Sequence, residues 1–447
     1  MEAYDTSLIG NFYGLPQFRK RFGSGLHNGT QAGQMIGLFL CGLIAERYGY
    51  KKTFLGALEE SSAACPGAFQ TLTTTYAADV TPLALRPIIT TYTNMCWVIG
   101  QFISTGVLRA LLSRQADWAW RIPYALQWVF PIPIIIGVTL APESPTWLSL
   151  SDGRSARRNV AMIAHTNELE RLNQEGTSYI DCFRGTNLRR TTIVCGTWAG
   201  QVLCAGFDSD NSFNFGLGTS AMAIVGTFLS WFLLPHVGHR TLYVVGLAIM
   251  FSILVTVGSM GIPSPQASLG WAAGSLLMLF VITYDMTVRP VCYCLVAEIP
   301  STRLRIKTVA MARNAYLLVS IGANFLNPPI LNPSAWNLRD KGGFIWAGLC
   351  FLELVWAYFC LPEPKSRSSA ELEMLFEQGV SARKFSSNTV EVFSSQVTEK
   401  NETSTLDMIE KPRANGVKQG GGSKLGCHNN CFESSRMPEI AVVTTEE

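Results

Sequence analysis

Acidic and basic residues recur at one spacing in two distant parts of this chain. Arg86 follows Asp79 in the segment ADVTPLALR, and Arg305 follows Glu298 at the same spacing in AEIPSTRLR. Each pair has a proline between its charges, follows an apolar stretch and leads into another. Carboxylates and guanidinium groups at helix ends can form ion pairs, and such pairs can hold two parts of a protein together or release them.

The two motifs indicate an internal duplication. Glu298 lies 219 residues after Asp79, and Glu363 of Pro-Glu-Pro lies 220 residues after Glu143 of Pro-Glu-Ser-Pro. Two pairs of motifs at nearly the same offset suggest a repeated architecture. In an apolar chain, such duplication is typical of a membrane transporter that is built from two halves.

Composition supports an integral membrane protein. The 447 residues are 48% hydrophobic and only 15% charged, whereas soluble domains are about 25% charged. The net charge of +3 gives no footprint for nucleic acid. No nucleotide-binding loop, nucleophile triad or zinc motif is present in the sequence, so we predict neither an enzyme nor a metal or cofactor.

We predict nine membrane-spanning helices in an all-helical protein, because a span needs about 20 apolar residues. The predicted spans are residues 28–45, 88–108, 122–141, 191–207, 213–235, 241–260, 268–297, 308–331 and 342–362. Residues 1–141 would form an incomplete first bundle, 142–190 a cytoplasmic loop, 191–362 a second bundle and 363–447 a cytoplasmic tail. Clusters of Arg and Lys predict that both termini face the cytoplasm.

The first half is shorter than the second. Arg47 and Arg240 each close or follow an apolar helix, yet Asp79 lies only 32 residues after Arg47, whereas Glu298 lies 58 residues after Arg240. The shorter interval has Glu59 at its centre, so no continuous span fits there. Residues 1–15 are also too few and too polar to span. In the tail, residues 370–385 alternate apolar and charged residues at helical spacing, which predicts an amphipathic helix, and we predict disorder after residue 386.

Six segments carry a resemblance to a known family. They are YDTSLIGNFYGLPQF, AERYGYKK, WRIPYALQWVFP, PESPTWL, AEIPSTRLR and LPEPKSRSSAELEMLFEQGVSARKF. In this order they resemble the sugar-porter branch of the major facilitator superfamily, and most closely the fungal maltose/α-glucoside:proton symporters. The resemblance extends over residues 1–386 with gaps.

The resemblance implies a fold of twelve helices in two bundles that rock around a central sugar site. Against that plan, this chain lacks most of helix 1, nearly all of helices 3 and 4, and part of helix 7. It also has Arg289 in helix 10 where the family has a glycine. An arginine in the middle of a span is expensive unless it is paired, and Asp285 lies one helical turn earlier.

Asp5 is an acid in the segment that corresponds to the first membrane helix. Such a carboxyl is retained when it is protonated, paired or in contact with water. The resemblance implies a role in proton coupling for Asp5. The alternative is a polar residue at a frayed helix end.

The charges at helix ends have two interpretations. The resemblance implies a lattice of ion pairs that holds the outward-open state and breaks when the cytoplasmic side opens, and matched copies in two halves suit an interface with two states. Its members would be Arg47, Asp79, Arg86, Glu143, Glu298, Arg305 and Glu363. The alternative is static anchoring at the level of the lipid headgroups.

Recognition of a sugar requires amides and hydroxyls for its hydroxyl groups, and aromatic faces for its ring. The candidates in the predicted spans are Asn94, Gln101, Thr105, Gln201, Tyr293 and Asn314. Asn94 and Gln101 are seven residues apart, which places them on one helix face. The alternative for each residue is a hydrogen bond between helices, which is common for polar residues in membrane bundles.

The sequence therefore predicts a plasma-membrane transporter that carries maltose or another α-glucoside together with protons. Its partners would be a small sugar, the proton and the lipid bilayer. Two alternatives remain open. One is a sugar sensor of the same fold that binds without transport. The other is a decayed or wrongly spliced copy without activity.

Overall fold

The structure is a computed structural model that describes residues 2–12, 26–59, 65–82, 85–111, 118–141, 178–205, 213–262, 267–301, 304–331, 338–365, 367 and 369–385. These residues lie in the first of two compact units, Met1–Val392. Every regular element among them is a helix. Glu143, most of the predicted loop 142–190 and the tail beyond residue 385 lie outside the described residues.

The helices before residue 142 are called the first helix set, and the first of them, α1, is short. They are α1 (Glu2–Phe12), α3 (Leu26–Tyr48), α4 (Tyr50–Glu59), α5 (Cys65–Val80), α6 (Arg86–Leu111), α7 (Trp118–Leu126), the 3₁₀ turn η1 (Gln127–Val129) and α8 (Pro131–Leu140).

The second helix set consists of longer helices, and two short elements follow it. The set comprises η3 (Tyr179–Phe183), α11 (Gly185–Ala205), α12 (Phe213–Leu233), α13 (His239–Met260), α14 (Ala267–Met286), α15 (Val288–Glu298), α16 (Arg305–Leu331), η5 (Arg339–Gly342) and α17 (Gly343–Cys360). After it come α18 (Ser369–Glu377) and η6 (Ala382–Lys384). α11 begins before residue 191, where we predicted the end of the loop.

Within the described ranges, six stretches are long and apolar enough to cross a bilayer. They are Trp120–Leu140, Phe215–Leu233, His239–Met260, Leu269–Glu298, Arg305–Asn327 and Gly343–Cys360. The other three predicted spans lie in α3, α6 and α11, which are equally long but more polar. Part of that polarity is turned inward, since α6 buries Thr90, Thr91, Asn94, Ser104 and Thr105.

Two predicted spans are interrupted where proline begins a new helix. Residues 122–141 form α7, η1 and α8, with Pro131 in the first turn of α8. Residues 268–297 form α14 and α15, which meet at Thr287, and Pro290 lies in the first turn of α15. Proline has no N–H to donate, so it is accepted in the first turn of a helix and disrupts the helix interior.

Apart from α7 and α8, which together form one stretch, three described helices of the first set are too short to span. α1 has 11 residues, α4 has 10 and α5 has 16, which correspond to lengths of about 16, 15 and 24 Å. The hydrocarbon core is about 30 Å thick. As the sequence predicts, no continuous span lies between Arg47 and Asp79 among the described residues.

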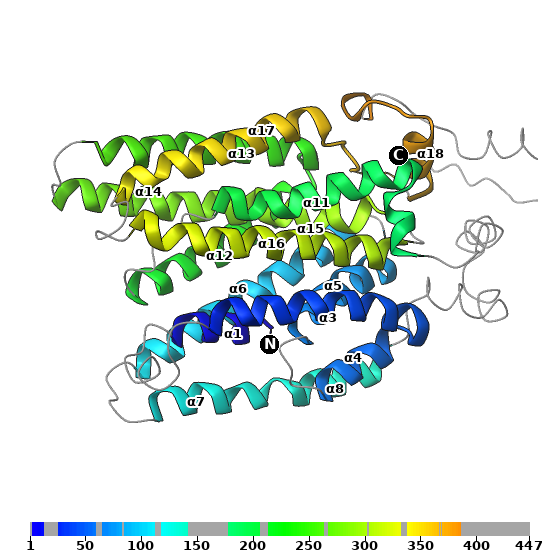
Figure 1. Cartoon of the computed structure of the whole chain (residues 1–447), viewed down its shortest axis with the longest axis horizontal. Helices are drawn as coiled ribbons and strands as arrows, with labels where there is room; N and C mark the ends of the chain where they lie inside the picture. The colour runs from blue at the N-terminus through cyan, green and yellow to red at the C-terminus, as the bar shows by residue number, and fades with distance from the viewer. Residues whose placement is uncertain are drawn as a thin grey trace, which may run out of the picture. The chain divides into compact units, whose positions relative to one another are not determined.

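The two helix sets meet along α3 and α6. α3 packs on α16, and α6 packs on α12 and α15, while α5 contacts both α15 and α16. Figure 1 shows α3, α5 and α6 beside α15 and α16, with α7 and α8 on the side away from the second set.

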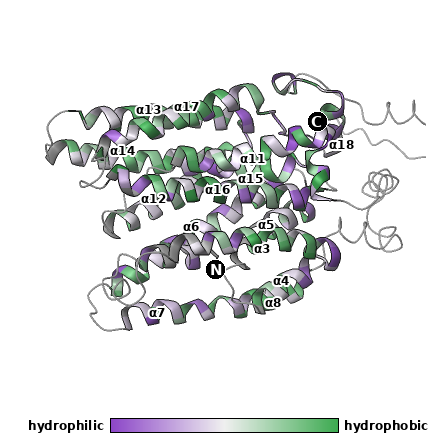
Figure 2. Ribbon diagram, in the orientation of Figure 1, coloured by the Kyte–Doolittle hydropathy of each residue, from purple (hydrophilic) through white to green (hydrophobic). Residues whose placement is uncertain are grey.

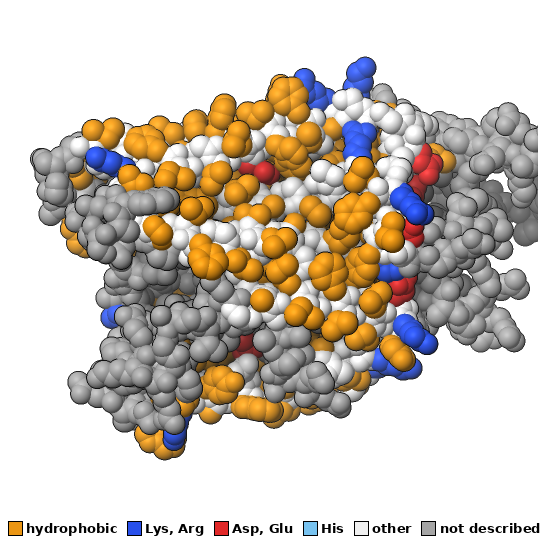
Figure 3. Space-filling view, viewed as in Figure 1, with side chains coloured by type: hydrophobic (Ala, Val, Ile, Leu, Met, Phe, Trp, Pro, Cys, Tyr) orange, Lys and Arg blue, Asp and Glu red, His pale blue; other side chains and the backbone are white. Residues whose placement is uncertain are grey.

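The apolar core is unevenly divided between the two sets. One large cluster fills the second set around Trp198, Tyr243 and Trp346. The first set has only small clusters, such as the one around Tyr4. Only 6% of the apolar 18-residue stretch within Trp120–Leu140 is buried inside the protein. The apolar side chains of this helix pair therefore need lipid around them. Figure 3 shows apolar side chains over the length of the bundle, and Lys, Arg, Asp and Glu gathered near the end where α18 lies; in Figure 2 the hydrophilic residues concentrate there as well.

The predicted amphipathic helix in the tail is shorter than expected. α18 ends at Glu377, and η6 is a separate turn. Gly379 has a φ of 67°, and the N–H of Val380 donates to the carbonyl of Leu375 at 3.2 Å. A glycine in the left-handed region ends a helix in this way at no steric cost.

Small residues allow α11 and α17 to pack closely. A side chain at Gly196 would collide with the ring of Trp356, and one at Gly200 would collide with the carboxyl group of Glu353. The two glycines are four residues apart, so they form one flat face on α11, as in other membrane helix pairs.

Gly196→Leu should therefore force α11 and α17 apart and lower stability by about 1–3 kcal/mol, the usual cost of overpacking. The measurement is the thermal unfolding midpoint of the purified protein in detergent. Gly348→Leu is the matched control, because a side chain at Gly348 of α17 meets nothing within 4 Å. Equal midpoints for the two variants would contradict this packing.

Candidate functional site

A buried ion pair joins the two helix sets at the charged end of the bundle, where α3, α5 and α15 end and α6, α13 and α16 begin. Arg305 of α16 pairs with Asp79 of α5, and both side chains are almost fully buried. The hydroxyl of Tyr50 in α4 donates to the other oxygen of Asp79 at 3.2 Å. Burial, followed by the nearby Asp79 carboxylate, raises the pKa of Tyr50 above its usual value, so Tyr50 remains a hydrogen donor.

A second group of contacts links the sets beside this pair. Lys307 of α16 lies 2.7 Å from Glu46 of α3, and its ammonium group faces the ring of Tyr179 at 5.8 Å. Tyr179, in η3, donates to the carbonyl of Phe39 in α3 at 2.9 Å. The turn that precedes α11 therefore contacts α3 and α16 together.

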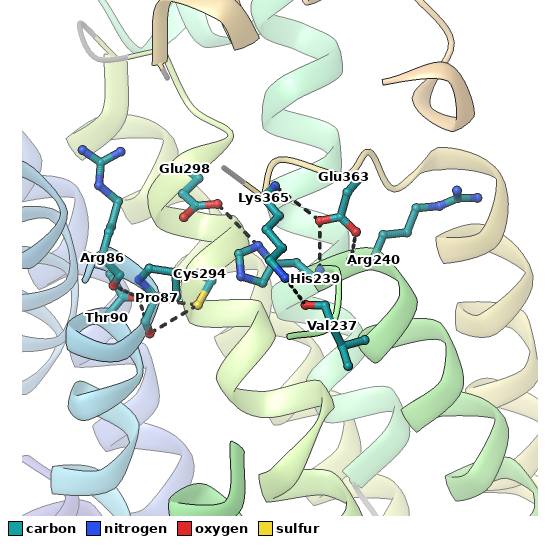
Figure 4. A network of polar contacts seen from close by, with 10 residues as sticks. All are labelled: Arg86, Pro87, Thr90, Val237, His239, Arg240, Cys294, Glu298, Glu363 and Lys365. Atoms are coloured by element: carbon teal, nitrogen blue, oxygen red, sulfur yellow. Dashed lines mark hydrogen bonds and ion pairs between the residues drawn. The ribbon is translucent and has the colours of Figure 1, made fainter. Parts of the chain in front are cut away.

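Glu363 caps the beginning of α13 in the second set. Its carboxylate accepts hydrogen bonds from the backbone N–H groups of His239 at 2.9 Å and Arg240 at 3.0 Å. An acidic group at a helix N-terminus satisfies free N–H groups and interacts well with the helix dipole. Figure 4 shows His239 between Glu363 and Glu298, with its Nδ1 3.6 Å from the Glu298 carboxylate.

The other predicted members of the lattice differ in their surroundings. Arg86 forms no ion pair among the described residues, but its guanidinium group lies within electrostatic reach of Glu298 and Asp79. Figure 4 shows it beside Glu298. Arg47 is exposed at the end of α3 and has no ion pair in the described part of the chain.

Asp285 and Arg289 form a second buried ion pair midway along the helices. Their charged atoms are 2.9 Å apart, at the junction of α14 and α15. This confirms the predicted pairing and explains how an arginine is retained there. The guanidinium group also faces the ring of Trp97 in α6 at 4.3 Å. The pair therefore lies against the first helix set.

Two predicted sugar ligands are close to this pair. The amide of Gln201 in α11 donates to the carbonyl of Arg289 at 3.4 Å. The amide of Asn94 in α6 donates to the hydroxyl of Thr227 in α12 at 3.2 Å, while its carbonyl oxygen has no partner among the described residues. Asn94 is also within hydrogen-bond reach of Asp285. These contacts join α11 to α15, and α6 to α12 and α14.

Tyr293 lies in a neighbouring aromatic group, and Asn314 follows Arg313 of that group in α16. The rings of Tyr293 and Tyr316 are each 5.5 Å from that of Trp198, and the guanidinium group of Arg313 covers Trp198 at 4.6 Å. Asn314 is buried, and neither its amide nitrogen nor its oxygen has a hydrogen-bond partner within the described ranges. Buried amides are normally satisfied, so Asn314 is notable.

The remaining two ligand candidates lie farther along α6. Thr105 is buried and donates to the carbonyl of Gln101, one turn earlier. Gln101 is partly exposed. Among the described residues, neither side chain forms a hydrogen bond with Gln201, Tyr293 or Asn314.

Asp5 is buried against α6 and α7. Its neighbour Tyr4 donates to the carbonyl of Pro123 at 2.8 Å and packs on Phe130. One carboxyl oxygen of Asp5 has no hydrogen-bond partner among the described residues, and Gln127 bonds to the group. The acid is therefore inside the protein and not at a frayed end.

The sequence did not predict several of these groups. Glu46, Lys307 and Tyr179 contribute to the interface, yet each is a single polar residue without a repeated pattern. No cluster of three metal-binding side chains occurs in the part of the chain that the structure describes.

These observations define a class of protein. Two sets of helices meet along α3–α16 and α6–α12, with polar groups buried between them, which is the architecture of a major facilitator transporter. A solved structure of the proton:xylose symporter XylE bound to 6-bromo-6-deoxy-D-glucose has this fold, with a TM-score of 0.70 and 18% identity over 84% of this chain and 96% of that one. An inward-open XylE from E. coli gives a TM-score of 0.59.

Sequence relatives define the family. Residues 62–376 match the family described as "Sugar (and other) transporter". The alpha-glucosides permease MPH3 of Saccharomyces cerevisiae is 36% identical over 88% of this chain and 78% of its own length. The maltose permease MAL61 of the same species is 34% identical over 94% of this chain and 80% of its own length. The chain belongs to the sugar transporter family and is a multi-pass membrane protein.

Arg305→Gln should lower stability by about 3–5 kcal/mol, because it leaves the Asp79 carboxylate buried without a counter-charge. The double variant Asp79→Asn/Arg305→Gln should regain part of the loss. The measurement is again thermal unfolding of the purified protein. Arg47→Gln is the control, since Arg47 is exposed. An Arg305→Gln protein that unfolds at the parent temperature would show that the pair contributes nothing.

Proposed function

We propose that this chain carries maltose or another α-glucoside across the plasma membrane together with protons, by alternating access. The observation that carries the proposal is the identity of 34–36% to α-glucoside and maltose permeases over 88–94% of the chain. The buried polar groups between the helix sets agree with it. The proton gradient would supply the driving force.

The sugar site would lie where the helix sets meet, around Gln201, Tyr293 and Asn314. Asn314 and Asn94 offer amide atoms without partners among the described residues, and sugar hydroxyls are suitable partners for amides. Trp97 and Trp198 offer aromatic faces nearby. Gln101 and Thr105 would contribute, if at all, farther along α6.

Asp5 would be the proton-coupling carboxyl. It is buried beside α6, which also carries Asn94. A buried carboxyl with one unsatisfied oxygen changes its protonation when its exposure to water changes. Rocking of the helix sets would produce that change.

The ion pairs at the charged end would act as the gate on the cytoplasmic side. Asp79–Arg305 and Glu46–Lys307 each join the two helix sets, so they must break for that side to open. Arg86, Glu298 and Glu363 would adjust the same network, and Glu143 would belong to it by motif. The positively charged residues at this end favour a cytoplasmic orientation, with both termini in the cytoplasm and residues 1–141 and 191–362 acting as the two bundles.

Maltose added to a lightly buffered suspension of yeast cells that express this chain, and that lack maltose permeases of their own, should raise the pH of the medium. Protons enter with the sugar, so the external pH rises. Asp5→Asn should abolish the rise, because the variant cannot exchange a proton at that site. Glu377→Gln, which removes an exposed carboxylate of α18, is the control.

Three outcomes of that experiment would contradict the proposal. Sugar binding without uptake would indicate a sensor. Retention of the protein in the endoplasmic reticulum would indicate an inactive copy. A pH rise that survives Asp5→Asn would move the coupling to another group.

Asn314→Leu separates a sugar ligand from a structural amide. We expect the KM for sugar to rise by about 3- to 10-fold, since one hydrogen bond is worth about 0.5–1.5 kcal/mol. The unfolding temperature should not fall, because the variant removes a buried amide that has no partner among the described residues. A fall in unfolding temperature with an unchanged KM would assign Asn314 a structural role.

A further inference from the structure

Glu353 is a carboxyl group near the middle of a membrane span. It lies in α17, a helix of 18 residues with no other charged side chain, and it is only 6% exposed. An acid at this depth is retained only if it is protonated, paired or in contact with water. Asp285 meets this requirement through Arg289 at 2.9 Å. Glu353 has no such ion pair among the residues that the structure describes.

The positive charge of Arg313 acts electrostatically on Cys292 beside Glu353, but Arg313 forms no ion pair with Glu353 among the described residues. No Lys, Arg or His forms an ion pair with it in the part of the chain that the structure describes. The neutral titratable groups that interact with it are Tyr243 of α13, Cys204 of α11 and Cys292 of α15. All of these are neutral when protonated. Burying a carboxylate among them would be costly, whereas a carboxylic acid with a hydrogen-bond partner is accepted.

The carboxyl group is placed directly against the backbone of α11. Gly200 has no side chain, and a Cβ there would overlap the carboxyl carbon and oxygens of Glu353. α11 is also the helix that carries Gln201 and Trp198. Any change at Glu353 is therefore felt by the helix that we place in the sugar site.

The hydroxyl group of Tyr243 lies within reach of two acceptors, the carboxyl group of Glu353 and a backbone carbonyl of α11. Its hydroxyl oxygen lies 3.3 Å from the Oε1 of Glu353 and 3.5 Å from the carbonyl oxygen of Thr197. A phenol has one hydrogen to donate, so it can serve only one of these acceptors at a time. An ionised Glu353 carboxylate would accept the hydrogen bond from the Tyr243 hydroxyl. A carboxylic acid would donate its own hydrogen to the Tyr243 oxygen and leave the phenol free to donate to Thr197.

The choice of acceptor acts on Gln201. In an α-helix the carbonyl of Thr197 is the acceptor for the N–H of Gln201, four residues later. When the Tyr243 hydroxyl donates to the Thr197 carbonyl, this oxygen accepts two hydrogen bonds. When Tyr243 turns away, the oxygen accepts only the hydrogen bond from within the helix. The protonation of Glu353 thus alters the hydrogen bonding of α11 one residue away from Gly200.

We propose that Glu353 is a second proton-binding site, in the second helix set, whose protonation redirects the hydrogen of Tyr243 between Glu353 and the carbonyl of Thr197. One proton is taken up by the carboxylate from water, and no other bond is made or broken. The proposal rests on the proposed function in one respect, namely that movement of the helix sets lets water reach α11 and α17. Binding of the proton itself does not depend on transport.

Infrared difference spectra of the purified protein, recorded between acid and alkaline pH without sugar, test the proposal. A protonated buried carboxyl gives its own C=O stretching component. Glu353→Gln should lose one such component, and Asp5→Asn should lose a different one. Tyr243→Phe should keep the Glu353 component but shift its frequency, because the carboxyl group loses its hydrogen-bond partner. Glu377→Gln, which changes an exposed carboxylate, should leave all buried components in place.

A folded Glu353→Gln protein with every component intact would overturn the proposal. A Tyr243→Phe spectrum without a frequency shift would overturn the exchange of hydrogen bonds, and it decides the matter alone if Glu353→Gln does not fold. These spectra need no sugar uptake, so a chain that fails to transport can still show the Glu353 component. A transporting chain can equally fail to show it, which keeps the two proposals separate.

Discussion

Charges inside a bilayer are stable only beside partners, and this constraint organises the protein. Asp79 and Arg305 are both buried, come from different helix sets and pair with each other. Removing either partner leaves the other in an apolar environment, at a cost of several kcal/mol. The helix sets are therefore held together at the charged end by an ion pair that is either formed or broken. That property suits a gate with a closed and an open position.

The apolar packing is distributed in a way that agrees with this arrangement. The large core of the second helix set gives α11, α13, α15, α16 and α17 a common scaffold. The first set has short helices and small clusters, and its α7–α8 pair is mostly exposed, with contacts to α1, α4 and α6. The hydrogen bonds and ion pairs between the sets therefore help to fix the positions of the helices in the first set. The short α5 is held by the ion pair of Asp79 and its hydrogen bond from Tyr50, and by the apolar cluster that Leu72 forms with α3 and α4.

Much of the fold could be predicted from the sequence, because membrane helices can be recognised by their length and apolar composition. The missing span between Arg47 and Asp79 was predicted from Glu59 and its neighbours, and the Asp285–Arg289 pair from helical spacing. The choice of partners was not predictable. The duplicated motif places Asp79 near Arg86 along the chain, yet Asp79 pairs with Arg305, since only contact between the sets decides this. Glu46, Lys307 and Glu353 have no repeat or period, so no pattern marked them. The end of α18 at Glu377 depends on one backbone angle at Gly379.

The central claim is that this chain, with its shortened helices, couples sugar movement to protons. Uptake of radiolabelled maltose into proteoliposomes that contain only this protein tests it most directly. An imposed pH gradient, acid outside, should drive accumulation above the external concentration, and a protonophore should collapse it to equilibration. Accumulation that ignores the gradient, or no uptake in either condition by correctly folded protein, would contradict the account.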